Sequence, residues 1–310
     1  MSPTLRSAWR LDSDPARPPF SGRSICVVGG DEREVEVLRC LIVDGASVRA
    51  CGCHPNATQV LGVPQSSTLA AAIAGADAVI TPVPVIGRNG ELYAPSWPNQ
   101  LCLDEAAFTH AKADLPVLMG TMTEAVHTLA ERLGLRLVCY GDDEELAIRR
   151  APSVVEGALA LAISGTAVSI HDSRAVVIGF GRLGFTLTRT LLALGSRVTA
   201  VARDQMQRAR AWELGASTEP LNRLADACGT ADFVFNTAPA PLLSRAILAR
   251  MTLDVFVVDL ADPPGGTDFQ AAEDLGIRAI LGRGLGGRAP QTVGRLQYSV
   301  IRRMLLAALA

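Results

Sequence analysis

Lysine is nearly absent from this sequence of 310 residues. Of the 29 basic residues one, Lys112, is lysine and the other 28 are arginine. A phosphate-binding P-loop ends in Gly-Lys-Ser or Gly-Lys-Thr, and neither tripeptide occurs. Pyridoxal enzymes and Schiff-base aldolases need a lysine nucleophile, whereas Lys112 lies in a polar run, residues 109–114, that is typical of a solvated helix end. These enzyme classes are therefore excluded.

Features that mark nucleic-acid binding, membranes or secretion are also weak or missing. The net charge is −2 and the sequence pI is about 6.1, which does not favour a nucleic-acid surface. The sequence has no clean apolar run of about 20 residues that could cross a membrane. Residues 1–22 mix charges with proline and lack an apolar core, so they predict a flexible leader and not a signal peptide.

Cysteine and histidine do not form a metal-binding pattern. The seven cysteines are an odd number scattered mostly in apolar runs, which indicates reduced thiols in a cytoplasmic protein. Cys51, Cys53 and His54 are close in the sequence, but no second pair of ligands occurs at the spacing of a zinc site. We therefore predict no metal site.

The sequence does contain two units in which a strand, a glycine turn and a helix follow one another. They cover residues 24–42 and 174–194. Short apolar runs bounded by glycine are typical of strands buried on both faces of a parallel sheet. Further short runs alternate with helical patterns in both halves, so the predicted fold class is α/β, with two doubly wound parallel-sheet domains.

The second glycine turn has the pattern of a dinucleotide-binding site. Gly179, Gly181 and Gly184 follow a predicted strand and open a predicted helix, which is the context that this motif requires. The three glycines permit a tight turn, close approach of a pyrophosphate and close helix packing. Arg182 and Leu183 lie between them and are expected to contact the cofactor at the helix N-terminus.

The strand that follows this helix bears on the choice of cofactor. It ends at Arg203, which suits the 2′-phosphate of NADP, whereas an acidic residue there would suit the ribose of NAD. Asp204 comes next and leaves NAD open, and Arg208 and Arg210 on the next helix could assist or face solvent. We favour NADP.

The turns that follow later strands of this half are expected to surround the ribose and nicotinamide. Turn formation alone would also select such short polar residues. The residues expected to contact the cofactor there are Asn236, Thr237, Pro239, Asp259, Leu260 and Ala261.

The first glycine turn is a poorer phosphate site because Asp31 would repel an anion. Arg33 is placed to bind a carboxylate bidentately, which indicates that the first domain binds the substrate. Asp31 or Glu36 is the candidate base, and Thr237 is expected near the nicotinamide. An alternative is that Asp31 only caps the helix, with Arg33 and Glu36 on its surface. No histidine lies in these turns, so a histidine-assisted mechanism is disfavoured.

These patterns predict the domain boundaries. We expect a leader at 1–22, a flavodoxin-like substrate-side domain at 23–150, a connector helix at 151–172, and a Rossmann NAD(P)-binding domain at 173–290. The last helix, at 291–310, is expected to pack back onto the first domain.

Motifs along nearly the whole chain resemble one known family, the A-type subunit of dipicolinate synthase, which is the dehydrogenase-like subunit of that enzyme. They are GGDxRxxE at residues 29–36, APSVVEG at 151–157, GFGRLG at 179–184, NTAP at 236–239, DLADPPGGTDF at 259–269 and GLGGRAPQTVG at 284–294. The chain departs from the family pattern at Arg150, where the family commonly has asparagine, and in a slightly short loop at 284–288.

The resemblance implies a fold similar to 2-hydroxy-acid dehydrogenases and a nicotinamide-linked oxidation. The substrate would be a dihydrodipicolinate-level dicarboxylate and the product pyridine-2,6-dicarboxylate. The partner would be the flavoprotein-like B-type subunit of dipicolinate synthase, in the mother-cell cytoplasm of a sporulating bacterium. A homo-oligomer is also expected. Two alternatives remain open: another dehydrogenase or reductase of an amino or keto acid, and a non-catalytic nicotinamide-binding subunit.

Overall fold

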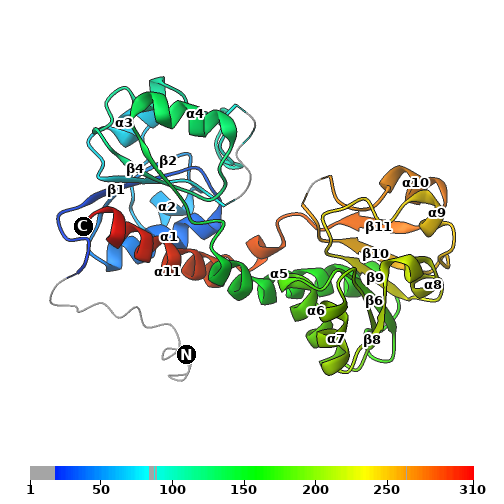
Figure 1. Ribbon diagram of the computed structural model, residues 1–310. Coiled ribbons are helices and arrows are strands. Elements are labelled where there is room, and N and C mark those ends of the chain that lie inside the picture. Colours follow the sequence, from blue (N-terminus) through cyan, green and yellow to red (C-terminus); the bar gives the residue numbers. More distant parts are fainter. Residues whose placement is uncertain (1–17, 84–86, 88, 263) are drawn as a thin grey trace. The chain divides into compact units, whose positions relative to one another are not determined.

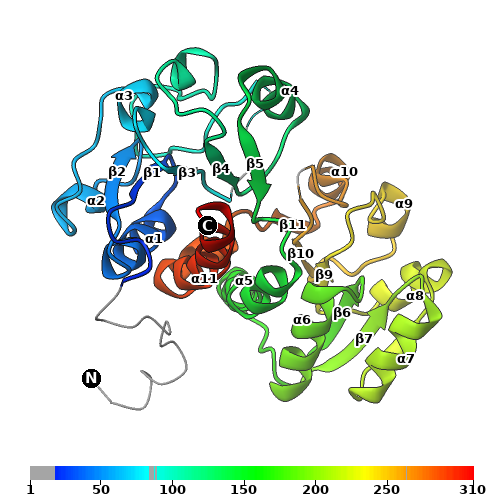
Figure 2. The same ribbon diagram turned by 60° about the vertical axis from the view of Figure 1, so that its left-hand side comes forward.

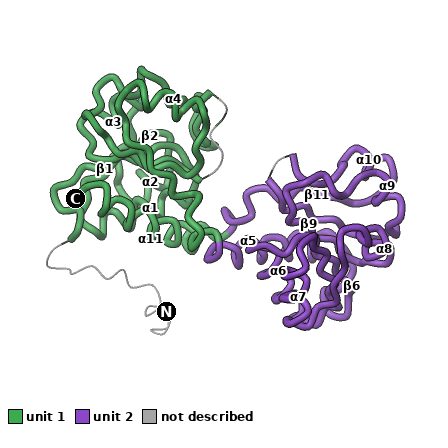
Figure 3. The backbone as a smooth tube through the Cα atoms, in the orientation of Figure 1, with its two compact units in different colours: residues 1–147, 289–310 green, residues 148–288 purple. Residues whose placement is uncertain are grey.

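The chain divides into two compact units in the computed structural model, which describes residues 18–83, 87, 89–262 and 264–310 (Figure 1). Unit 1 comprises residues 1–147 and 289–310, and unit 2 comprises residues 148–288 (Figure 3). Most of the expected leader lies outside the described residues. Its last part forms turns, where Phe20 is buried in the core of unit 1 and donates its N–H to the carbonyl of Asp44.

Unit 1 is built on a five-stranded parallel sheet in the order β2-β1-β3-β4-β5. Its strands are β1 (Ser24–Val28), β2 (Ser47–Cys51), β3 (Ala78–Ile80), β4 (Pro116–Met119) and β5 (Arg136–Cys139). Its helices are α1 (Glu32–Val43), α2 (Asn56–Gln59), α3 (Leu69–Ile73), the 3-10 helix η2 (Ala106–Phe108), α4 (Glu124–Leu133) and α11 (Pro290–Ala308).

Helices cover both faces of this sheet, as the doubly apolar strands require (Figure 1). Ile25 and Val27 of β1 pack with residues of α1 and α11, whereas Cys26 and Val28 pack with residues of α3, η2 and α4. Alternate residues of a strand point to opposite faces, so each strand contributes to two cores.

The C-terminal helix α11 packs against α1, although the two are far apart in the sequence (Figure 2). Gly294 allows close contact, because a Cβ there would lie 2.6 Å from the carbonyl oxygen of Arg33. Further along, the fully buried carboxylate of Asp44 accepts hydrogen bonds from Tyr298 Oη (2.6 Å) and Arg302 Nε (2.7 Å). Hydrogen bonds to a buried charge therefore join the first and last helices of unit 1.

Unit 2 contains a six-stranded parallel sheet in the order β11-β10-β9-β6-β7-β8. The strands are β6 (Arg174–Ile178), β7 (Arg197–Val201), β8 (Ser217–Glu219), β9 (Phe233–Asn236), β10 (Phe256–Asp259) and β11 (Arg278–Leu281). The helices are α6 (Arg182–Ala193), α7 (Gln205–Glu213), α8 (Leu224–Cys228), α9 (Arg245–Leu248) and α10 (Phe269–Asp274), with 3-10 turns η3 (Leu221–Arg223) and η4 (Leu285–Arg288).

The two faces of this sheet again have separate cores. Residues of α5, α6 and α7 pack on one face, and residues of α8, α9 and α10 pack on the other. The two parallel sheets, each covered by helices on both faces, confirm the predicted α/β fold class.

The connecting helix differs from its expected position at 151–172. Helix α5 spans Glu144–Gly165, so it begins before Pro152, which lies inside the helix and not at its start. The helix starts earlier because the Asp143 carboxylate accepts the N–H of Leu146, and the acidic first turn suits the positive end of the helix dipole. Within the described residues, no helix has the length and apolar character needed to cross a membrane.

Replacing Tyr298 by phenylalanine tests the contact between α1 and α11. Tyr298→Phe removes one of two donors to the buried Asp44 carboxylate, and we expect a cost of roughly 1–3 kcal/mol. The melting temperature should therefore fall by several degrees in a thermal scan. Ser299→Ala is the control, since that hydroxyl donates within its own helix, to Leu296. Equal melting temperatures for the two variants would contradict this account.

Candidate functional site

The strand order of unit 2 brings two predicted turns together. Strands β6 and β9 are neighbours at the centre of the sheet, and Ile178 pairs with Asn236 at their carboxyl ends. From this pair the chain winds outward in opposite directions, which is the topological switch point where open α/β sheets bind ligands. The glycine turn follows β6, and Thr237 follows β9, so both lie at this point.

The glycine turn has the backbone geometry that a pyrophosphate requires. Gly179 has a φ of +89°, and a Cβ there would lie 2.7 Å from Thr237 Oγ1. A Cβ at Gly184 would overlap the carbonyl oxygen of Gly179, so glycine allows α6 to pack tightly on the turn. A Cβ at Gly181 would meet nothing within 4 Å, which leaves open space beside the backbone.

The N-terminus of α6 is suited to bind an anion. Gly181 is its N-cap and has no side chain to accept the first N–H groups. Gly181 and Arg182 are exposed and Leu183 is half-buried, in keeping with a site open to solvent. Helix dipole and N–H groups together favour a phosphate there.

Two charged residues follow β7: Arg203 is exposed to solvent, and Asp204 caps the next helix. Arg203 is exposed, whereas Asp204 is the N-cap of α7 and accepts the N–H of Gln207 at 3.0 Å. The guanidinium of Arg208 donates to the carbonyls of Ala202 and Arg203, each at 2.8 Å. Arg208 thus braces the backbone that carries Arg203.

Two residues expected to contact the cofactor are instead buried beneath the loops. Asn236 and Asp259 are both 0% exposed, and Asn236 Nδ2 donates to Asp259 Oδ1 at 3.0 Å. Asn236 also bonds to the backbone of Ala238 through both ends of its amide. Their polar side-chain atoms are used in binding the protein's own loops, which argues against a direct side-chain contact, and cofactor binding through the backbone at these two positions stays a prediction.

The remaining predicted residues of this edge lie in the strand-end loops. Thr237 is half-buried, and its hydroxyl donates to the carbonyl of Ile178 at 2.9 Å. Pro239 is exposed and Leu260 is half-buried, while Ala261 donates its N–H to Asp259 at 3.0 Å. Their contacts with a cofactor stay predictions.

In unit 1 the first glycine turn also lies at a switch point, between β1 and β3. Asp31 caps α1, and Glu34 completes a capping box by accepting the N–H of Asp31 at 2.8 Å. Arg33 donates from Nε and Nη2 to the two oxygens of Asp31, at 2.8 and 2.7 Å. Asp31 therefore caps the helix and holds the guanidinium of Arg33.

This pair is ionised in the folded protein. Burial opposes the charge on Asp31, but the hydrogen bond and the charge of Arg33 outweigh it, so the pKa of Asp31 is lowered. Burial likewise acts against the Arg33 charge, and Asp31 and Glu34 outweigh it, so the pKa of Arg33 is raised. A carboxylate with a lowered pKa in an ion pair is a poor proton acceptor, so the expectation that Asp31 is a base is corrected.

Glu36 is not at the strand ends with Asp31 and Arg33. Its buried carboxylate accepts from Arg295 of α11 at 2.7 Å and from Arg39 at 3.1 Å. The prediction that Glu36 is a candidate base is therefore corrected: it belongs to the contact between α1 and α11, where two guanidinium groups hold its charge.

The structure places three further residues near the Asp31–Arg33 pair: Glu34 and Tyr93, which the sequence did not single out, and His54, which the sequence suggested only as a metal ligand. Glu34 is 1% exposed, and its Oε1 has no hydrogen-bond partner among the described residues. The charge of Asp31 raises the pKa of Tyr93, second to burial, and His54 contributes to lowering the pKa of Asp31. The spacing Asp-x-x-Glu could have revealed Glu34, and His54 follows the neighbouring strand β2, but Tyr93 gave no local indication.

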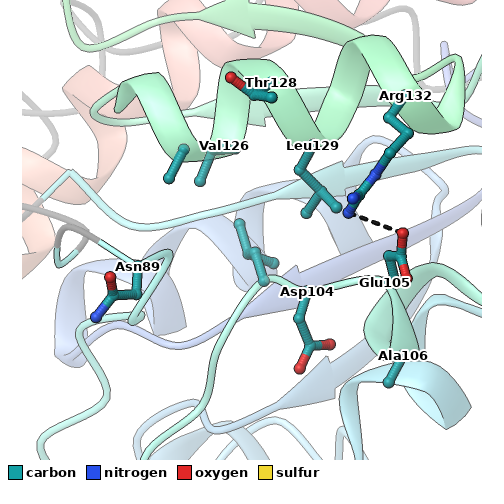
Figure 4. Close-up of a pocket in the computed structure, with 10 residues that line it drawn as sticks. Asn89, Asp104, Glu105, Ala106, Val126, Thr128, Leu129 and Arg132 are labelled. Carbon is teal, nitrogen blue, oxygen red and sulfur yellow. Dashed lines mark ion pairs between the residues drawn. The ribbon is translucent and has the colours of Figure 1, made fainter.

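A separate hollow of unit 1 contains none of the predicted site residues. It has a volume of about 530 Å³ and lies between the η2 region and α4. Its lining residues include Asn89, Asp104 and Thr128, and Arg132 points toward Glu105 across it to form a 2.8 Å ion pair (Figure 4). In the part of the chain that the structure describes, no group of three or more His, Cys, Asp or Glu side chains is placed to hold a metal ion.

The fold and the glycine turn define the class of this protein as a nicotinamide-linked oxidoreductase of the two-domain dehydrogenase type. Residues 148–262 match the family model "D-isomer specific 2-hydroxyacid dehydrogenase, NAD binding domain". D-lactate dehydrogenase from Escherichia coli shares the fold, with a TM-score of 0.62 at 15% identity, over 91% of this chain and 96% of that chain. The predicted enzyme class is confirmed.

More specific matches cover nearly the whole chain. Residues 24–140 match the family model for the N-terminal domain of the A-type subunit of dipicolinate synthase. The A-type subunit from Bacillus subtilis is 30% identical over 92% of this chain and 97% of its own length. The crystal structure of the same subunit from Bacillus halodurans has a TM-score of 0.85 at 29% identity, over 92% of this chain and 98% of that chain. The chain belongs to the family of dipicolinate synthase A-type subunits, which confirms the resemblance drawn from the motifs.

Substitution of Glu34 tests its burial through the pH dependence of stability. Burial raises the pKa of Glu34 from 4.5 to about 7. Because the folded protein then binds this proton more tightly than the unfolded chain, the stabilising effect is complete below pH 4.5 and is lost as the pH rises through 7. Glu34→Gln keeps the capping box without a titrating group. We expect it to be more stable than the wild type above pH 7, by up to about 3 kcal/mol.

The measurement is urea unfolding of both proteins from about pH 5 to pH 9. The advantage of Glu34→Gln over the wild type should grow from about pH 5 to pH 7, where only the folded protein keeps the proton, and should level off above pH 7. Glu32→Gln, on the exposed side of the same helical turn, is the control and should show no such trend. A difference that is constant with pH would contradict the raised pKa.

Proposed function

We propose that this protein is the dehydrogenase subunit of a dipicolinate synthase. It oxidises a dihydrodipicolinate-level cyclic imine dicarboxylate to pyridine-2,6-dicarboxylate with NADP, acts with a flavoprotein-like B-type subunit, and serves sporulation in the mother-cell cytoplasm. The observation that carries the proposal is the intact glycine turn at the N-terminus of α6, in a chain that matches the family across both of its units.

In this reaction the protein has to do little more than bind and orient the substrate. Loss of a hydride and a proton makes the ring aromatic, so the driving force lies in the substrate. The bound nicotinamide would accept the hydride. The protein's own groups have to hold the carboxylates, orient one C–H bond and let a proton leave. Since Asp31 and Glu36 are both held by arginine, the proton leaves to water or to another group.

Arg33 is suited to bind one substrate carboxylate. A guanidinium has five N–H donors, and Asp31 accepts two of them, from Nε and from Nη2. The other three donate no hydrogen bond to any residue that the structure describes, and Arg33 is 7% exposed, so only one part of the side chain can be reached by a ligand. Because Asp31 fixes the plane of the guanidinium, little conformational entropy is lost when a carboxylate binds.

The end of β7 supports NADP over NAD. An NAD site uses a carboxylate at the end of this strand for the ribose 2′-hydroxyl, whereas here the first exposed charged side chain is that of Arg203, and Asp204, one residue further on, is the N-cap of α7. The backbone of Arg203 is braced by Arg208, and its exposed side chain supplies the charge that a 2′-phosphate needs.

The direct test of the function mixes the purified chain with freshly generated dihydrodipicolinate and NADP, with and without the B-type subunit. We expect the ultraviolet absorbance of dipicolinate to appear together with NADPH. Tight binding of NADPH without turnover in any pairing would contradict the proposed reaction and would favour a non-catalytic nicotinamide-binding role.

Reversal of charge at Arg203 tests the cofactor preference. Arg203→Glu should lower kcat/KM for NADP by about 100-fold while changing that for NAD by less than about threefold, because only NADP carries the 2′-phosphate. Arg197→Glu makes the same charge change at the opposite end of β7 and should leave both values unchanged. Equal losses for both cofactors in Arg203→Glu would refute the phosphate contact.

A conservative change at Arg33 tests the substrate contact. Arg33→Lys keeps the charge but loses the two-pronged geometry, so KM for the dicarboxylate should rise at least about tenfold with KM for NADP unchanged. Arg39→Lys, on the exposed side of α1, is the matched control. If steady-state kinetics show the same KM for the dicarboxylate in Arg33→Lys and the wild type, Arg33 does not bind the substrate.

A further inference from the structure

Asp259, at the carboxyl end of β10, has a side chain whose two oxygens are both fully engaged by the protein. Its Oδ1 accepts from Asn236 Nδ2 and the N–H of Ala261, both at 3.0 Å. Its Oδ2 accepts from the N–H of Gly266 at 2.8 Å and from Thr267 Oγ1 at 2.6 Å. Four donors therefore surround a carboxylate that is 0% exposed.

These donors come from both ends of one loop and from the neighbouring strand. Ala261 lies near the start of the loop that follows β10, and Gly266 and Thr267 lie near its end, before α10. Asn236 ends the adjacent strand β9, where it pairs directly with Asp259. The carboxylate thus ties the two ends of the loop to each other and to the turn that carries Thr237.

The glycines near the end of the loop fit tightly around this carboxylate. A Cβ at Gly265 would lie 3.1 Å from Asp259 Oδ2, and a Cβ at Gly266 would lie 2.5 Å from Asn236 Nδ2. The backbone can pass this close only because both positions lack a side chain. Its path there is therefore set by Asp259 and the adjacent Asn236 together.

The strand order indicates which part of a dinucleotide this loop would meet. The glycine turn after β6 is the pyrophosphate position, and Arg203 after β7 marks the adenosine side. Strands β9 and β10 lie on the other side of β6, so the loops after them face the nicotinamide half of an extended cofactor.

We propose that Asp259 is a positioning residue that shapes the two ends of this loop, residues 260–262 and 264–267, and the Asn236–Thr237 turn to receive the nicotinamide half of the cofactor, without touching the cofactor itself. This inference rests on the nicotinamide-binding part of the proposed function, and not on the identity of the substrate. The carboxylate acts through the loop because it has no exposed atom with which to reach a ligand.

The experiment compares binding of a whole cofactor with binding of its adenosine half. In Asp259→Asn one acceptor oxygen becomes an NH2 donor, which then faces either the N–H of Gly266 or the N–H of Ala261, so in either orientation the loop loses at least one hydrogen bond from its backbone. The Kd for NADPH, from fluorescence titration, should rise at least about tenfold. The Kd for 2′,5′-ADP, from calorimetry, should stay within about twofold. NADH and ADP form the matched pair if NAD is the preferred cofactor.

Variants of Thr267 separate an action through the loop from direct contact. Thr267→Val removes one donor to Asp259 and leaves the carboxylate in place, so it should weaken NADPH binding about threefold or more. Thr267→Ser keeps the hydroxyl and should bind like the wild type. If Asp259→Asn does not fold, these two variants decide the question by themselves.

Three outcomes would overturn the proposal. Unchanged NADPH binding in Asp259→Asn, or in Thr267→Val where Asp259→Asn does not fold, would show that the loop does not position the cofactor. Equal weakening of NADPH and 2′,5′-ADP would show general structural damage. Weak binding in Asp259→Asn combined with normal binding in Thr267→Val would show direct contact by the carboxylate. Because every measurement is of binding, a failure to make dipicolinate would leave these results interpretable.

Discussion

The close packing of α6 on the end of β6 is the contact on which the candidate cofactor site depends. The backbone of Gly184 packs directly against the carbonyl of Gly179, and any side chain at position 184 would overlap that carbonyl oxygen. This contact sets where α6 begins and therefore where its first N–H groups point. Gly181 keeps the space beside them open, so an anion and the helix end can meet without an intervening side chain.

Buried or half-buried carboxylates hold the backbone in both units. Asp31 caps α1 and fixes Arg33, Asp259 ties together a loop, and Glu36 and Asp44 join α1 to α11. A buried charge is costly unless it is paired or hydrogen-bonded, and each of these carboxylates accepts hydrogen bonds from the protein's own groups. Arginines and backbone N–H groups are then left to bind the anionic cofactor and the dicarboxylate substrate that we propose.

Predictions from the sequence succeeded where the information was local. Apolar runs bounded by glycine located the strands, and the spacing of Gly179, Gly181 and Gly184 located the turn that opens α6. They failed where the answer depended on other parts of the chain. The order of residues around Pro152 suggested a helix start, but the cap at Asp143 and the acidic first turn begin α5 earlier. The sequence suggested that Glu36 was free to act as a base, but Arg295 of α11, more than 250 residues further along the chain, pairs with its carboxylate.

The sequence by itself determined the alternation of strands and helices, the glycine turn, and the family to which its motifs point, since these follow from spacing over a few residues. Only the tertiary structure decided which polar side chains are free to meet a ligand. Asn236 and Asp259 follow strands just as a binding residue would, yet the returning loop takes up their hydrogen-bonding groups. Burial and hydrogen-bond partners arise from segments brought together by folding, and spacing along the chain does not specify them.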